Sequence, residues 1–352
     1  MDETAQQFLH ELLTTPSPSG GEVEIQKKWK AYVESYADQM LTDHAGNVIG
    51  VLNPEAEFKI LLAGHSDEIG FVIQRIDEDG FLYFTKVGGI SAKTAIGMKV
   101  EILGYKKRIT GVIGANAEHH GGAKKDVDFE DLYIDCGAKN KEEIEQYVQI
   151  GDLAVYQREP EFLLNNRISG RGLDNRTGAF IVAEVLKNVA QKGSKVGVYA
   201  ASTVNEETNM GGAYFAGAGI QPDMAIACDV TFATDYPGVN RKKHGEIDID
   251  NGPVLAKGAP IHGKVNGLLE QSAKRLGLNV QYELTPKMTG TDADKMRYTG
   301  RGVPVALVSL PLRYMHAPVE TVSMQDIEEE IELLTDMIVH LTGEENLNPL
   351  EE

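Results

Sequence analysis

The segment Lys59-Ile60-Leu61-Leu62-Ala63-Gly64-His65-Ser66-Asp67-Glu68 joins an apolar run directly to three ionisable side chains. A short apolar run that ends at glycine predicts a buried strand. In an open α/β sheet, residues just beyond the strand ends line one crevice, even when they lie far apart in the sequence. The segment therefore predicts an α/β sheet and places His65 in the crevice beyond one of its strands.

Further acids and a second histidine follow apolar runs in the same way. Runs at 195–203, 224–229 and 305–310 predict three more strands, and Pro311 is expected to close the last one. A glycine-rich turn also leads into a helix predicted at 177–190. The candidate site residues that follow these strands, or lie in the turn, are Asp174, Glu206, Glu207, Asp229 and His316.

The chain is long enough for more than one domain. Its 352 residues exceed the size at which a single hydrophobic core usually stops growing. Between residues 70 and 162, short β-type runs alternate with glycine and charged turns, which predicts a small β-barrel. We therefore predict an α/β domain formed by residues 1–69 and 163–352, with the β-rich segment 70–162 inserted into it.

Composition excludes several classes of partner. The net charge of −19 would repel a phosphate backbone, so nucleic acid is not an expected partner. No apolar stretch approaches the roughly 20 residues that span a bilayer, and Met1-Asp2-Glu3 does not begin a signal peptide. The two cysteines, Cys136 and Cys228, form no recognisable disulfide framework. We predict a cytoplasmic protein without a membrane segment.

The sequence suggests a specific role in a metal site for Asp67 and for Asp174. The motif His65-Ser66-Asp67 places its two end side chains on the same side of an extended segment, so Asp67 is positioned to accept the imidazole N–H that a metal does not use. Asp174 is either an N-cap of the following helix or a carboxylate that bridges two metal ions about 3.5 to 4 Å apart. We favour the bridge, because a carboxylate offers two oxygens.

The adjacent acids Glu206 and Glu207 repel each other unless a cation or a proton compensates them. In a metal site one of them would ligate a metal, while the other would accept a proton from metal-bound water as the general base. The alternative is a solvated acidic turn. The residues alone do not show which of the two glutamates is the ligand and which is the general base. Taken singly, Asp229 is typical of a turn acid and His316 of a loop histidine, but the set as a whole predicts a two-metal hydrolytic site.

The chain carries, in order, the motifs His65-Ser66-Asp67-Glu68-Ile69-Gly70, Gly172-Leu173-Asp174-Asn175-Arg176, Glu206-Glu207, Cys228-Asp229, Gly290-Thr291-Asp292-Ala293 and Arg313-Tyr314-Met315-His316-Ala317-Pro318-Val319-Glu320. Over nearly its whole length it resembles the TET-type (tetrahedral) dinuclear metallo-aminopeptidases, a family with members labelled glutamyl aminopeptidase or endoglucanase. The resemblance implies a mixed-sheet α/β catalytic domain with an inserted β-barrel-like dimerisation domain. It also implies homo-oligomers, commonly dodecamers built from dimers.

Carried over by motif, the resemblance implies two divalent metal ions per subunit. Asp174 would bridge them, Glu207 and His316 would complete one site, and His65 and Asp229 would complete the other. The two histidines would therefore bind different ions. Zinc suits mixed imidazole and carboxylate ligands, and cobalt and manganese are the alternatives.

The implied activity is removal of the N-terminal residue from short peptides. A water that bridges the two metals would attack the scissile carbonyl, with Glu206 as the general base and Asp67 as the partner of His65. A metal-dependent deacylase or carboxypeptidase, and a non-catalytic assembly that contains metal, are the alternatives. The segment 208–212 departs from the family pattern and leaves the substrate preference open.

Overall fold

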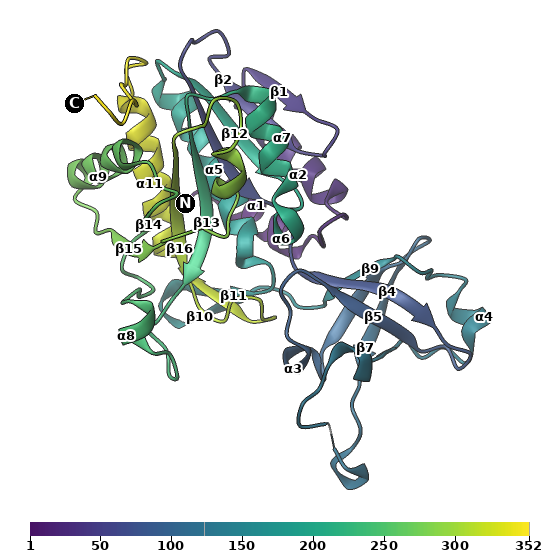
Figure 1. Cartoon of the computed structure of the whole chain (residues 1–352). Coiled ribbons are helices and arrows are strands. Elements are labelled where there is room, and N and C mark those ends of the chain that lie inside the picture. Colours follow the sequence, from purple (N-terminus) through teal and green to yellow (C-terminus); the bar gives the residue numbers. More distant parts are fainter. Residues whose placement is uncertain (123, 352) are drawn as a thin grey trace.

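The computed structural model describes residues 1–122 and 124–351. Within these residues, eight strands form one sheet with parallel and antiparallel neighbours (Figure 1). The central strands are parallel, and both margins of the sheet include antiparallel pairs. The predicted mixed α/β fold is confirmed. In spatial order the strands are β1 (Gln39–Thr42), β2 (Val48–Leu52), β12 (Gly197–Thr203), β3 (Lys59–His65), β13 (Met224–Phe232), β16 (Val305–Leu312), β14 (Val254–Lys257) and β15 (Gln281–Leu284).

Helices cover both faces of this sheet, and each face has its own buried apolar cluster. Among the residues that the structure describes, no helix is both long and apolar enough to cross a membrane. The helices of the larger cluster are α1 (Glu3–Thr14), α2 (Val23–Val33), α5 (Leu173–Lys192), α9 (Gly263–Leu276) and α11 (Met324–His340). The helices of the smaller cluster are α7 (Gly211–Ile220) and α10 (Ala293–Met296).

A closed barrel lies to one side of the sheet (Figure 1). It confirms the prediction of a β-barrel-like insertion, and its strands run from Gly70 to Tyr156, inside the predicted segment 70–162. In barrel order, the strands in the described residues are β4 (Gly70–Ile76), β5 (Leu82–Val87), β8 (Ile134–Asp135), β7 (Arg108–Ile113), β6 (Lys99–Leu103) and β9 (Leu153–Tyr156). Short helices accompany them: α3 (Ala92–Ala95), η1 (Glu118–His120), η2 (Phe129–Asp131) and α4 (Lys141–Ile144).

The remaining elements belong to neither the large sheet nor the barrel. A small antiparallel sheet follows the barrel, and two short helices lie after β12 and β13. The exact limits of the predicted domains stay a prediction. These remaining elements are β10 (Glu161–Leu163), η3 (Leu164–Asn166), β11 (Arg167–Gly170), β17 (Glu320–Ser323), α6 (Glu206–Asn209) and α8 (Arg241–His244).

One expectation about strand limits is wrong. Pro311 does not end β16, which continues to Leu312 while still paired with β13. Proline lacks a backbone N–H and is tolerated where a strand has no neighbour on one side. The pairing with β14 reaches only Val308 and Ser309, so Pro311 lies beyond it, at a free edge of β16.

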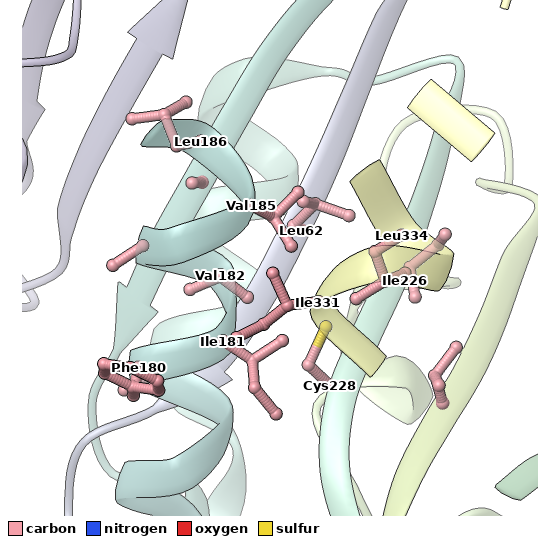
Figure 2. Close-up of a cluster of buried hydrophobic side chains, with 14 of the residues drawn as sticks. Leu62, Phe180, Ile181, Val182, Val185, Leu186, Ile226, Cys228, Ile331 and Leu334 are labelled. Atoms are coloured by element: carbon pink, nitrogen blue, oxygen red, sulfur yellow. The ribbon is translucent and has the colours of Figure 1, made fainter. Parts of the chain in front are cut away.

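The contact between α5 and the sheet fixes the position of the site. Figure 2 shows the apolar side chains that fill the space between α5, β3, β13 and α11, including Leu62, Ile181 and Ile226. A Cβ atom at Gly64 of β3 would lie well inside 3.0 Å of the backbone of Gly178 in α5. The two backbones therefore approach each other more closely than any side chain would permit. As a result, the first turn of α5 lies beside the end of β3.

The variant Gly64→Ala tests this contact. Its added methyl group would meet the backbone of α5 rather than a movable side chain, and overpacking of this kind destabilises a protein by about 1–3 kcal/mol. Gly267→Ala in α9 is the matched control, because its Cβ would meet no atom within 4 Å. It should be neutral or stabilising by up to about 1 kcal/mol. Guanidinium unfolding of the two variants measures the difference, and equal stability would refute the close-contact account.

Candidate functional site

His65 ends β3 and is fully buried among acids. Its Nε2 atom lies 3.3 Å from Oδ1 of Asp174, 3.6 Å from Oε2 of Glu206 and 3.9 Å from Oδ1 of Asp229. Its other ring nitrogen, Nδ1, lies 3.1 Å from the carbonyl oxygen of Asp67. A carbonyl oxygen only accepts hydrogen bonds, so Nδ1 carries the hydrogen and Nε2 is free to bind a ligand.

A second group of possible ligands lies beside the first. His316 Nε2 is 3.4 Å from Oδ2 of Asp174 and 3.5 Å from Oε2 of Glu207. The Nδ1–H of His316 donates to the carbonyl oxygen of Gly89 at 3.0 Å. Gly89 lies between β5 and α3, so the barrel segment holds the ring of this histidine. A side chain at Gly89 would collide with that ring, because its Cβ would lie 2.6 Å from Nδ1.

Asp174 faces both histidines through different oxygens. It does not act as an N-cap: its backbone is extended (φ −78°, ψ 106°), and regular helical geometry in α5 begins beyond the cis peptide bond to Asn175. Asn175 makes the cap instead, since its Oδ1 accepts the N–H of Gly178 at 2.9 Å. Its Nδ2 donates to the carbonyl oxygen of Cys228 at 2.7 Å, which ties the first turn of α5 to the residue before Asp229. A carboxylate at position 175 would lack this donor.

Asp67 is the anchor of the glutamate pair. Its Oδ1 accepts the backbone N–H of Glu206 at 3.0 Å, and its Oδ2 accepts that of Glu207 at 3.2 Å. Ser19, in the loop between α1 and α2, donates its hydroxyl to Oδ2 at 2.6 Å. Burial alone would raise the pKa of Asp67, but the hydrogen bonds from His65 and Ser19 hold it below its ordinary value. The ionised Asp67 therefore fixes the start of α6 relative to β3.

Glu68 is equally buried but is neutralised by the protein itself. Its carboxylate accepts from Arg171 Nη1 at 2.5 and 2.6 Å, from Arg176 Nη2, and from the N–H of Ser17 at 3.0 Å. Burial would raise the pKa of Glu68, but the two guanidinium groups lower it below the ordinary value. This ion-pair network fastens the turn before α5 to the end of β3.

Glu320 closes the other side of the site. Its Oε1 accepts the N–H of His316 at 2.8 Å and its Oε2 accepts the N–H of Asp174 at 3.2 Å. The side chain is 1% exposed, and burial together with the charge of Asp174 raises its pKa well above the ordinary value. Glu320 therefore fixes the backbones of His316 and Asp174, two members of the second ligand group, relative to each other.

The acidic groups of the site are not balanced by protein cations. Burial raises the pKa of Glu206 to about 10 and that of Glu207 well above its usual range; Asp229 and Asp174 respectively reinforce these shifts. Among the described residues, no hydrogen-bond partner reaches the buried Oε1 of Glu207. Divalent cations would compensate this charge and use that oxygen. The donor set therefore fits metal ions.

The possible metal ligands form two groups of three, one with His65, Glu206 and Asp229 and the other with Asp174, Glu207 and His316. In each group the ligand atoms lie within 4.8 Å of one another. The geometry thus brings together every residue that the sequence nominated, including Asp67, while the individual roles stay predictions. Glu206 belongs to the first group, so position alone does not separate a ligand from a base.

Several supporting residues were not assigned a role from the sequence. Glu320 and Asp292 lie inside recognised motifs, and spacing from His316 could have suggested Glu320. Asp292 accepts the hydroxyl of Thr203 at 2.5 Å, and burial raises its pKa to about 6. Gly89 and Ser19 carry no local signal, because each reaches the site only through the tertiary fold.

The two ligand groups open into a cavity of about 580 Å³, lined by residues from the ends of β13 and β16 and from the loop after β15. This position, beyond the strand ends of an α/β sheet, is typical of substrate sites. A sheet, a cavity and clustered imidazoles and carboxylates in this arrangement define the class of metal-assisted hydrolases.

Comparisons with known proteins identify the family. The sequence profile of the M42 glutamyl aminopeptidases matches residues 46–333, and the chain belongs to this family. A lysyl aminopeptidase of Pyrococcus furiosus is 30% identical over 341 residues, which cover 95% of this chain and 97% of the relative. The predicted resemblance is confirmed, and the chain is a hydrolase of the aminopeptidase class. The family is metal-dependent, and the two ligand groups are its candidate metal positions here.

Solved structures agree with this assignment. The crystal structure of a TET aminopeptidase from a marine sediment archaeon of the Thaumarchaeota superposes with a TM-score of 0.91 at 28% identity, covering 96% of this chain and 97% of that one. The TET1 peptidase of Pyrococcus horikoshii superposes with a TM-score of 0.85 at 29% identity, covering 96% and 100% of the two chains. The latter protein assembles into a tetrahedron or a large octahedral shell.

The variant Glu68→Gln tests the buried ion-pair network. Removing the charge leaves Arg171 and Arg176 buried without their anion, which typically destabilises a protein by about 3–5 kcal/mol. Because the folded pKa of Glu68 is lowered, its contribution is present above about pH 4.5 and is lost as the pH falls toward the folded pKa. Unfolding at pH 7 and pH 4 measures both effects.

The control for this variant is Glu24→Gln. Glu24 pairs with Arg108 at the surface, where both side chains are largely exposed, so its loss should change stability by less than about 1 kcal/mol. If Glu68→Gln were as mild as Glu24→Gln, the network would not be what holds the turn before α5.

Proposed function

We propose that the chain is a two-metal aminopeptidase that removes the N-terminal residue from short peptides. The observation that carries the proposal is the position of Asp174. Its Oδ1 lies 3.3 Å from His65 and its Oδ2 lies 3.4 Å from His316, so one carboxylate is shared by two ligand groups. A carboxylate shared in this way is the arrangement that a two-metal hydrolase requires.

In this proposal Glu207 and His316 would hold one divalent ion, His65 and Asp229 would hold the second, and Asp174 would be shared by both. Zinc is favoured, with cobalt and manganese as alternatives. The chemistry that such ions would supply when bound is a lower pKa for the attacking water and polarisation of the scissile carbonyl.

The protein supplies the proton transfers. Glu206 accepts a proton from the attacking water and passes it to the amine that leaves. Asp67 holds the backbone N–H groups of Glu206 and Glu207, and it keeps His65 in the tautomer whose Nε2 is free. The carbonyl oxygen of Gly89 accepts the Nδ1–H of His316 and so keeps its Nε2 free. The carboxylate of Glu320 accepts the backbone N–H of His316 and holds its backbone in place.

Peptides with free and acetylated N-termini test the proposed reaction. We expect cleavage of the free peptide, at least a hundredfold slower cleavage of its acetylated counterpart, and loss of both activities after chelation. Zinc, cobalt and manganese should be returned separately to the chelated protein, and at least one should restore activity. Preferred cleavage of the acetylated peptide would favour the deacylase alternative, and inactivity with every metal would favour a non-catalytic assembly.

The variant Glu206→Gln tests the proposed base. It should keep the metal content of the wild type and lower kcat by about 10²–10⁴, because proton acceptance is lost while the shape is retained. Glu207→Gln is the matched neighbour, and it should lose metal because it alters a proposed ligand. Elemental analysis and steady-state kinetics measure both properties. Near-normal turnover by Glu206→Gln would refute its role as the base.

We further propose that the chain assembles into homo-oligomers, with the segment 70–162 as the dimerisation domain. A tetrahedral particle with one dimer on each edge would contain twelve subunits, and a related peptidase forms such a tetrahedron. Apolar side chains on this segment, Val112 and Ile150, are 43% and 67% exposed, which suits an interface. The cytoplasmic location and the exclusion of nucleic acid stay predictions from composition.

A further inference from the structure

The cavity of the candidate site contains a carboxylate that none of the proposed roles uses. Glu283 lies on β15, at the margin of the sheet, and its side chain lines the same cavity as Asp174 and His316. Its Oε2 accepts the hydroxyl of Thr231 at 2.6 Å, and its Oε1 accepts the hydroxyl of Ser309 at 2.8 Å. Two hydroxyl groups, one from β13 and one from the adjacent strand β16, therefore hold both oxygens of Glu283 in fixed positions.

The charge of Glu283 lacks a protein counter-ion. Among the described residues, no lysine, arginine or histidine nitrogen lies within 4.0 Å of its carboxylate. Burial raises its pKa above the ordinary value, although the Thr231 and Ser309 hydroxyls lower it. By contrast, the buried Glu68 has two guanidinium partners. An oriented carboxylate without a partner, facing a cavity, is a binding position for a cation.

The position of Glu283 relative to the reacting centre defines what kind of cation fits. Thr231 lies two residues beyond Asp229 on β13, so the two side chains point to the same face about 7 Å apart. The lining of the same cavity also includes the apolar residues Phe232, Met288 and Leu307. A cavity that offers both apolar lining residues and a carboxylate matches the methylene stem and charged head of lysine or arginine.

One cation of the protein also lines the cavity and would favour the opposite selectivity. Lys295 lies on α10, and it is exposed, so its ammonium group is solvated. A solvated charge gives a substrate carboxylate little advantage over water. Glu283 is less exposed and held by two hydroxyl groups, so it should dominate the choice of side chain.

We propose that Glu283 is a specificity-determining residue that binds the ammonium or guanidinium group of an N-terminal lysine or arginine. The inference rests on the proposed aminopeptidase function and adds a substrate class to it. The first residue of the peptide would place its stem along the apolar lining residues and its charged head at the Glu283 carboxylate. Residues with neutral or acidic side chains would leave the half-buried carboxylate of Glu283 without a compensating charge.

Paired aminoacyl substrates test this assignment. Lysyl and norleucyl derivatives share the four-carbon stem and the free α-amine, but only lysine has the side-chain ammonium group. On metal-loaded wild-type enzyme we expect lysyl and arginyl substrates to have about 10- to 100-fold higher kcat/KM than the norleucyl substrate. Free L-lysine should inhibit competitively and more strongly than L-norleucine. A glutamyl substrate should be the poorest of the set.

The variant Glu283→Gln keeps the shape and an acceptor oxygen but removes the charge. The ratio of kcat/KM for lysyl over norleucyl substrate should fall by about 10- to 100-fold, mainly through a higher KM for the lysyl substrate. Glu57→Gln is the control: Glu57 is exposed and does not line the cavity, so the same loss of charge should leave the ratio unchanged. The thermal midpoints of both variants should be measured alongside.

The outcomes separate this inference from the proposed function. If norleucyl and leucyl substrates are cleaved but lysyl substrates have no advantage, the assignment of Glu283 is wrong and the aminopeptidase proposal stands. A preference for glutamyl substrate would also overturn it and would point to Lys295. If Glu283→Gln weakens lysyl and norleucyl cleavage equally, the assignment is also overturned, because Glu283 then supports the structure or binds the α-amine. Absence of cleavage with every substrate and metal would instead count against the proposed function.

Discussion

The close approach of α5 to β3 is the constraint on which the site depends. Gly64 and Gly178 have no side chains where the two backbones meet, and a Cβ at either position would collide with neighbouring backbone. If α5 were held farther from the sheet, Asp174 would move away from His65, because it lies directly before the regular turns of that helix. Two glycines with no chemistry of their own therefore determine whether the shared carboxylate is within reach of both ligand groups.

Two buried carboxylates hold the chain segments around this contact in place. The consecutive acids Asp67 and Glu68 follow β3 and diverge to different partners. Asp67 accepts the backbone N–H groups that begin α6, whereas Glu68 accepts from Arg171 in the turn before α5 and from Arg176 in α5. A single strand end thus positions two of the three other segments that supply acids to the site, while Asp229 comes from β13. This explains why a fully buried pair of acids is tolerated there.

The sequence predicts those parts of the fold and site that depend on local patterns. Strand-end positions were sufficient to nominate His65 and Asp229, and the apolar rhythm was sufficient to predict the sheet and barrel. By contrast, the carbonyl of Gly89 reaches His316 from the barrel segment, and Ser19 reaches Asp67 from the first loop. No periodicity encodes which loop folds back onto which strand end. Pro311 was misread for the same reason, since only the neighbouring strand determines whether its missing N–H matters.

The buried carboxylates differ in how their charge is compensated, and this difference separates structure from function. Glu68 is neutralised by Arg171 and Arg176, so the free-energy cost of burying its charge is offset within the folded protein. The acids around Asp174 and the carboxylate of Glu283 lack such partners, so folding leaves their desolvation uncompensated. A cation that binds next to these carboxylates recovers that free energy, which strengthens its binding. Metal ions suit the first group, where imidazole nitrogens lie beside the carboxylates, and a substrate side chain suits Glu283, which has no imidazole nitrogen beside it among the described residues.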